Sequence, residues 1–115
     1  MNAYSYIVRL HLADGTILYK VGKTNNTTRR FKEIQNYTYS TAVAWVEPIK
    51  VFTLCDENTA EVFESIMRRY FINKYGAKCH LKNDRFTGIA VTKADLNALN
   101  RKYRFVKIAT RLGLI

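Results

Sequence analysis

The amino-acid sequence predicts a small α+β protein: a central three-stranded antiparallel sheet flanked by helices, followed by a basic C-terminal extension. Three observations predict this class. Segments with alternating apolar residues come first, segments with apolar residues at helical spacing follow, and the tight-turn dipeptide Asp14-Gly15 separates the first two strand-like segments. The length of 115 residues favours one domain with one modest core.

The N-terminal half carries the strands. Residues 4–12 alternate in period two and are rich in Tyr, Ile, Val and Leu, and the chain returns after a turn whose glycine tolerates positive φ. The polar residues 25–28, which follow the second of these strands, can open a helix. The elements expected here are strands at 4–12 and 16–21, a helix that includes residues 28–34, and a strand at 41–54 that is broken or bent near Pro48.

A long helix is expected next. Asn58 is suited to be its N-cap, with Glu61 three residues later as in a capping box, and Gly76 to be its stop. Its apolar residues recur at helical spacing, which predicts a face packed into the core. They are Ala60, Phe63, Ile66, Met67 and Tyr70.

The C-terminal part is expected to hold a short strand at 86–91 and a last helix. Thr92 with Asp95 opens this helix, whose end the sequence does not define. We therefore divide the chain into a domain at 1–91 and a basic helical extension at 92–115 that packs on the same domain.

The charge distribution points to a polyanionic partner. The net charge is +10; residues 1–66 hold seven Lys or Arg and seven Asp or Glu, whereas residues 67–115 hold twelve against two. A basic half on a small protein favours nucleic acid over an acidic membrane, because the cations alternate with aromatics and form no single tract. With no leader-like or membrane-spanning segment, a cytoplasmic protein is expected.

Gly22-Lys23-Thr24 looks like the end of a phosphate-binding P-loop, but its context excludes that motif. The nearest upstream glycine, Gly15, stands too far away and belongs to the turn. The intervening residues 16–21 read as a strand, which cannot cradle a phosphate with successive amides. A zinc site from His11, Cys55, Cys79 and His80 is also disfavoured, because their spacing matches no usual ligand pattern.

The hairpin and the helix after it resemble the GIY-YIG nuclease superfamily. "AYSYIV" places Tyr6 at the tyrosine of the first motif, and "YKVGKT" places Lys20 and Gly22 in a K-[IV]-G version of the second. "NNTTRRF" places Arg30 at the superfamily's arginine, and the long helix supplies its glutamate, with Glu64 preferred to Glu61. The first motif lacks its glycine, and Ile34 stands where many members have a histidine.

This resemblance implies an endonuclease that hydrolyses DNA phosphodiester bonds with one Mg²⁺ or Mn²⁺ ion. Glu64 would bind the ion, which polarises the phosphate and stabilises the leaving oxygen. Arg30 would neutralise the non-bridging oxygens. Tyr6 would orient or deprotonate the attacking water, with Lys20 supplying charge across the hairpin or assisting as a base.

Further cations are expected to contact the nucleic acid backbone. The cations concerned are Lys23, Arg29, Arg101, Lys102, Arg104 and Lys107. Tyr103 or Phe105 could stack on an unpaired base, or the side of the last helix that carries Tyr103, Phe105 and Ile108 could pack inward.

Each proposed site residue also has an ordinary structural interpretation. Tyr6 fits a half-buried strand aromatic, Lys20 and Arg30 fit solvated side chains, and Glu64 fits an i,i+4 surface pair with Arg68. Two other functions therefore stay open: a catalytically inactive nucleic-acid-binding module on the same fold, and a phage-type protein-interaction factor that binds an acidic surface. RNA as substrate and a homodimer stay open as well.

Overall fold

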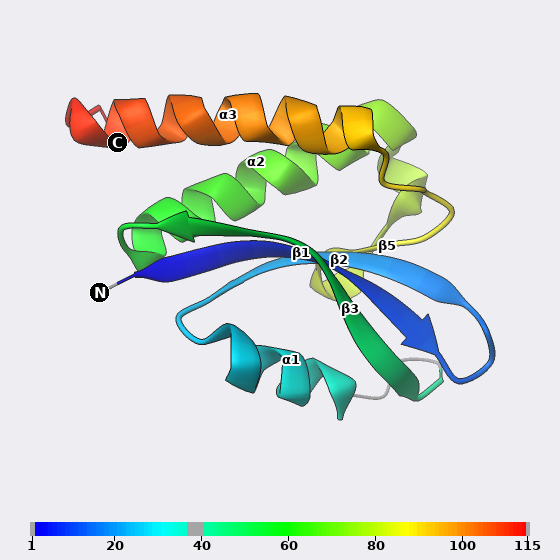
Figure 1. Cartoon of the computed structure of the whole chain (residues 1–115). Coiled ribbons are helices and arrows are strands. Elements are labelled where there is room, and N and C mark those ends of the chain that lie inside the picture. Colours follow the sequence, from blue (N-terminus) through cyan, green and yellow to red (C-terminus); the bar gives the residue numbers. More distant parts are fainter. Residues whose placement is uncertain (1, 37–40, 115) are drawn as a thin grey trace.

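A five-stranded sheet lies between helices in the computed structural model, which describes residues 2–36 and 41–114, with the side chain of Asn83 excepted (Figure 1). The strand order is β3-β1-β2-β5-β4, and every pairing is antiparallel. The strands are β1 Ala3–Leu12, β2 Ile17–Thr24, β3 Val43–Leu54, β4 His80–Leu81 and β5 Arg85–Phe86. The helices are α1 Thr27–Gln35, α2 Glu57–Tyr75 and α3 Lys93–Arg111, with short 3₁₀ turns η1 Ala77–Cys79 and η2 Lys82–Asp84.

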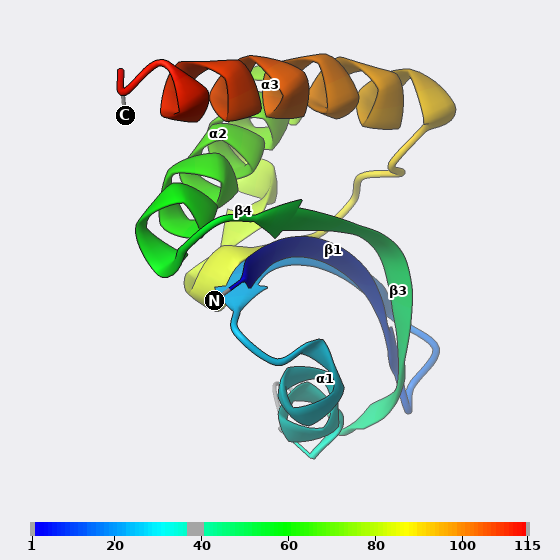
Figure 2. The same cartoon turned by 60° about the vertical axis from the view of Figure 1, so that its left-hand side comes forward.

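The central strand β1 is buried on both faces because helices cover both sides of the sheet. Tyr6, Val8, Leu10 and Leu12 pack with Ile34 of α1, which confirms the period-two pattern predicted for this strand. The alternate residues of β1, such as Ile7, pack with the α2 stripe. The curved sheet wraps around α1 (Figure 2). The two faces thus form two separate hydrophobic clusters, and Tyr6 belongs to the α1 cluster.

The α+β class is confirmed, while the sheet is larger than predicted. The three long strands form its main part, and β4 and β5 add a two-residue hairpin beside β2. The strand expected at 86–91 ends at Phe86, and Gly88 then adopts a positive φ of 69° that leaves the extended conformation. In β3, a register shift opposite Ile7 and Val8 accommodates Pro48, as the predicted bend requires.

The predicted start of the long helix was wrong by two residues. Asp56 is the N-cap of α2, and its side chain accepts from the backbone N–H of Thr59 at 2.8 Å, so Asn58 lies in the first turn. An ionised carboxylate at this position binds the exposed amides and also complements the positive end of the helix dipole. The predicted end at Gly76 is confirmed, with φ 95°.

Helix α3 packs on α2 at the side away from α1 (Figures 1 and 2). Thr92 and Asp95 form the predicted capping box. Tyr103 turns inward, donates to the carbonyl of Thr53 at 2.6 Å and contacts the ring of Phe52. No helix among the described residues combines the length and apolar character needed to cross a membrane.

Candidate active site

Tyr6 and Gly22 are paired across the first hairpin, and the Tyr6 ring lies over the glycine. The two residues are directly opposite in the β1–β2 register. A Cβ added at Gly22 would overlap the hydroxyl oxygen and Cζ of Tyr6 and lie 3.0 Å from its Cε1. Gly22 is therefore required by space: only a residue without a side chain leaves room for the phenol.

Arg30 reaches the same phenol from α1. Asn26 caps this helix by accepting from the backbone N–H of Arg29, and Arg30 stands in its first turn. Its Nε donates to the Tyr6 hydroxyl at 3.4 Å, and its Nη1 donates to Glu33 at 3.1 Å. The hydrogen bond to Tyr6 contributes most to raising the pKa of Arg30, so the guanidinium remains charged beside the phenol.

Lys20 is a buried cation on the face that carries Tyr6. It lies opposite Val8, two residues from the Tyr6–Gly22 pair, and only 5% of its surface is exposed. Paired residues on alternate positions point to the same face, so Lys20 and Tyr6 are neighbours across the strands. Burial, and then repulsion by Arg30, lower the pKa of Lys20 to about 8 despite attraction by Asp84 and Glu64.

Glu64 and Asp84 bring two carboxyl groups to the same place. Glu64 lies on α2, with 13% of its side chain exposed, and Asp84 ends η2 beside β2. Burial, and then a hydrogen bond with Asp84, raise the pKa of Glu64 to about 7. Burial also opposes ionisation of Asp84, but hydrogen bonds with Glu64 and His80 lower the pKa of Asp84 overall. The two shifts favour a proton on Glu64 and a charge on Asp84.

Arg68 and His80 hold the carboxyl pair in position. Arg68 donates to Asp84 Oδ2 at 3.0 Å and lies 3.7 Å from Glu64 Oε1. The Nε2 atom of His80 lies 3.2 Å from Asp84 Oδ1. Glu64 and Arg68 do form the i,i+4 pair that is the ordinary structural interpretation of Glu64. The contact of Arg68 with Asp84 is shorter than its contact with Glu64.

The sequence-predicted site residues thus gather around one end of β2. Tyr6, Gly22 and Arg30 are in direct contact, and Lys20 links them electrostatically to Glu64. We call Tyr6, Lys20, Gly22, Arg30, Glu64 and Asp84 the Tyr6 cluster. Glu61, ranked second to Glu64, is 63% exposed and lies 3.9 Å from Lys23.

Asp84 is the member that sequence reasoning missed. It has a positive φ of 55°, the only such value among the described residues other than glycine. Two signals were available: Asp84 is one of two carboxylates in the basic half, and the Asn83-Asp84 dipeptide suits a left-handed conformation. Neither signal predicts that the short β4–β5 turn folds back to Glu64.

The cations predicted to contact nucleic acid divide into two groups. Lys23 and Arg29 line a cleft of about 320 Å³ together with Arg30. Arg101, Lys102, Arg104 and Lys107 lie on α3, which is separated from α1 by the sheet and α2 (Figure 1). The cleft beside Arg30 therefore joins the Tyr6 cluster to the surface, while α3 presents a second basic surface.

The donor set near Glu64 suits Mg²⁺ better than zinc. Among residues 2–36 and 41–114 no group of three or more His, Cys, Asp or Glu side chains is arranged to hold a metal ion. Mg²⁺ keeps several waters and takes one or two carboxylates, whereas zinc needs three or four protein ligands. Two neighbouring carboxyl groups whose pKa shifts favour a proton on one of them, such as Glu64 and Asp84, can exchange that proton for a divalent cation.

One family model matches the chain. It is the T5orf172 domain, and the match covers residues 3–103. The matched region contains the whole sheet, α1, α2 and the first half of α3. No curated protein and no solved structure shows a significant similarity to the chain.

Proposed function

The chain belongs to the T5orf172 domain family, a phage-associated family related to nuclease folds, and from this premise we propose that it is a metal-dependent DNA endonuclease of the GIY-YIG type. The observation that carries the proposal is the Tyr6 cluster. A phenol, two cations and a carboxyl pair from five separate elements meet at the end of β2. Phosphodiester hydrolysis needs an activated water, a neutralised phosphate and a stabilised leaving oxygen. The groups of the Tyr6 cluster are of the kinds that meet these three requirements.

Arg30 is the phosphate-binding group of the proposed reaction. Its guanidinium borders the cleft that also contains Lys23 and Arg29, so a phosphate can approach it from solvent. Its Nε is directed to Tyr6, and Nη1 donates to Glu33 at the surface. Exchange of the exposed Glu33 carboxylate for a phosphate would give a charge-assisted bond without disturbing Tyr6.

Tyr6 and Lys20 are the groups that handle the proton of the attacking water. The phenol oxygen of Tyr6 accepts from Arg30, and a phenol can both accept and donate a hydrogen bond. Lys20 has a pKa of about 8, so a fraction of it is neutral near neutral pH and can accept a proton. Its burial keeps competing bulk water away from that nitrogen.

Glu64 and Asp84 are the groups that would hold a divalent ion. When bound, Mg²⁺ or Mn²⁺ polarises the phosphate and stabilises the leaving oxygen. Arg68 and His80 orient Asp84, as outer groups commonly orient metal ligands. Glu64 gives up its proton when the ion binds, so binding is expected to weaken as the pH falls below about 7.

A plasmid-nicking assay tests this function directly. Supercoiled DNA is incubated with the purified chain and Mg²⁺ or Mn²⁺, with EDTA in a parallel sample. We expect relaxed circles only when the metal is present. Tyr6→Phe should lower the rate at least tenfold (roughly 1.4 kcal/mol), whereas Tyr4→Phe, on the same strand outside the cluster, should not. Nicking in EDTA, or equal rates for the two variants, contradicts the proposal.

A catalytically inactive nucleic-acid-binding module is the second candidate. It is favoured by the cations of α3, none of which forms an ion pair within the described part of the chain. This function predicts DNA or RNA binding that weakens with salt and no cleavage under any metal condition. Substitution of Arg101, Lys102 and Arg104 would then weaken binding more than substitution of Glu64.

A further inference from the structure

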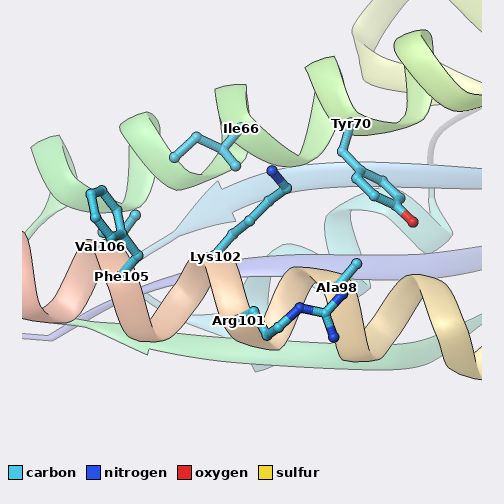
Figure 3. A pocket seen from close by; sticks show the side chains of 7 residues that line it. All are labelled: Ile66, Tyr70, Ala98, Arg101, Lys102, Phe105 and Val106. Carbon is cyan, nitrogen blue, oxygen red and sulfur yellow. The ribbon is translucent and has the colours of Figure 1, made fainter.

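A groove between α2 and α3 lies apart from the Tyr6 cluster. It encloses about 630 Å³ and is lined by Ile66 and Tyr70 from α2 and by five residues of α3 (Figure 3). Ile66 lies two residues after Glu64, which is about 200° around the helix axis. The groove therefore opens on the opposite side of α2 from the carboxyl pair, and the proposed catalytic reaction does not use it.

The lining of the groove combines apolar side chains with two cations. Ile66, Ala98, Phe105 and Val106 supply carbon surface, and Arg101 and Lys102 stand between the apolar ends (Figure 3). Among the residues that the structure describes, no carboxylate lines it. The acid nearest to it on α3 is Asp95, which is fully buried and bonded to Tyr70 and Lys74.

An exposed apolar stripe continues from the groove along α3. Phe105, Ile108 and Leu112 are 70%, 52% and 67% exposed. Their spacing of i, i+3 and i+7 places them on one line of the helix. A helix that already buries Leu99 and Val106 in the core does not need a second apolar stripe for folding. Such a stripe marks a binding surface.

The charges around this stripe select the partner. Between Lys93 and Arg111 the sequence has six cations, and its single acid, Asp95, is buried. A second copy of the chain would bring like charges together, which disfavours self-association. A bilayer is flat and would leave the concave floor empty. Nucleic acid fits the cations, but Ile108 and Leu112 have no planar ring on which a base could stack.

We propose that the α2–α3 groove and its stripe bind an acidic amphipathic helix of another protein. The apolar side of that helix would cover Ile66, Phe105 and Ile108, as in other helix-in-groove complexes. Its carboxylates would meet Arg101 and Lys102, which form no ion pair within the described part of the chain and can gain hydrogen-bonded partners. This surface gives the protein an interaction that is independent of the DNA reaction.

Selection from a helix library tests this surface. The probe is a displayed set of amphipathic helices with a fixed apolar stripe and with Glu, Lys or Gln varied at the flanking positions, selected on the full-length chain. We expect enrichment of Glu. Synthetic enriched helices should bind Phe105→Ser and Ile108→Ser at least tenfold more weakly than the unmodified chain (roughly 1.4 kcal/mol).

Ile17→Ser is the matched control, because Ile17 is 48% exposed, almost as exposed as Ile108, and lies on β2. It should bind the helices like the unmodified chain, and circular dichroism should show that all variants are folded. Absence of Glu enrichment, or equal loss with Ile17→Ser, overturns the proposal. The proposal is also overturned if Ile108→Ser weakens binding of the protein to a DNA duplex, or to vesicles with anionic lipid, and leaves its binding to the helices unchanged.

The same variants separate this proposal from the nuclease proposal. Ile108 lies outside the Tyr6 cluster and is not among the residues expected to contact nucleic acid, so Ile108→Ser should nick plasmid at the rate of the unmodified chain. Loss of helix binding with intact nicking supports the groove as a separate site. If a variant loses both nicking and helix binding, α3 is part of the DNA-binding surface, and this result contradicts a separate groove.

Discussion

Two buried charged clusters in this protein have opposite electrostatic character. At the N-terminus of α3, Asp95 is fully buried and accepts from Tyr70 at 2.7 Å, Tyr75 at 2.8 Å, the backbone N–H of Thr92 at 2.9 Å, and Lys74. Burial alone would raise the pKa of Asp95, but these hydrogen bonds outweigh it and lower the pKa well below its ordinary value. The fold thus stabilises the charged form of Asp95.

In the Tyr6 cluster the fold disfavours the charge of two members, Lys20 and Glu64, while it favours the charged forms of Arg30 and Asp84. The pKa of Lys20 falls to about 8 and that of Glu64 rises to about 7, mainly because burial removes both groups from water. Both shifts move the group toward its neutral form near neutral pH. The comparison teaches that the charge of Asp95, which its own neighbours stabilise, serves the structure, whereas Lys20 and Glu64, whose charges burial disfavours, are available for a ligand or a proton transfer.

Removal of Arg30 should have the largest effect of all single substitutions. Arg30→Ala is expected to lower the nicking rate by about 10²–10³-fold, because one preorganised donor to the developing charge is lost. Lys32→Ala, an exposed cation on the same helix, is the control and should change the rate little. Steady-state nicking of plasmid measures both. Similar losses for the two variants would mean that general positive charge, and not the cluster, supports the reaction.

Removal of Asp95 should affect stability and leave the nicking chemistry unchanged. Asp95→Ala is expected to cost about 3 kcal/mol in the free energy of unfolding, because Tyr70, Tyr75 and Lys74 lose their buried acceptor. Asp56→Ala, which removes an N-cap carboxylate outside such a network, should cost only about 1 kcal/mol. Urea unfolding compares them. Equal costs would show that Asp95 acts as a cap alone.

The stability supplied by Asp95 should also depend on pH. Its folded pKa is lowered, so this contribution is present above the unfolded carboxyl pKa of about 4 and is lost as the pH falls from there toward the folded value. Asp95→Asn should flatten this part of the acid unfolding curve. An unchanged curve in the variant would assign the acid sensitivity to other carboxylates.

Gly22 tests the steric relation that positions Tyr6. Gly22→Ala is expected to cost about 1–3 kcal/mol in stability, because the added Cβ overlaps the phenol ring. In a Tyr6→Ala background the same substitution should cost much less, since the ring is gone. A double-mutant cycle by urea unfolding gives this coupling. Additive costs would mean that Gly22 acts through its backbone conformation instead.

Lys20 gives the smallest expected effect, a dependence of rate on pH. With a pKa of about 8, the neutral amine increases about tenfold between pH 7 and 9, and the nicking rate should increase with it and then level off. Ionisation of Glu64 near pH 7 acts in the same direction at lower pH. Lys20→Arg keeps the charge but removes the titration, so it should abolish the increase above pH 8. A persisting increase would exclude Lys20 as the base.

The sequence predicted the parts of the site that depend on local pairing. One tight turn and a period-two strand set the pairing of Tyr6 with Gly22. Only a short loop separates β2 from α1, and this places Arg30 near that pair. Asp84 could not be predicted, because its place depends on how η2 folds back against α2 over a long sequence separation. The outward stripe of α3 was undecided for a similar reason: Tyr103 turns inward, while Phe105 and Ile108 do not.

The replacement Glu64→Gln tests the central claim most directly, because it keeps the shape of the side chain and removes its ionisation. Plasmid nicking and thermal unfolding are measured on the same preparation. The account predicts that nicking with Mg²⁺ falls at least about 10²-fold while the unfolding midpoint stays the same or rises, since the fold disfavours the Glu64 charge. Retained nicking, or a midpoint that falls as expected for Asp95→Ala, would contradict the account.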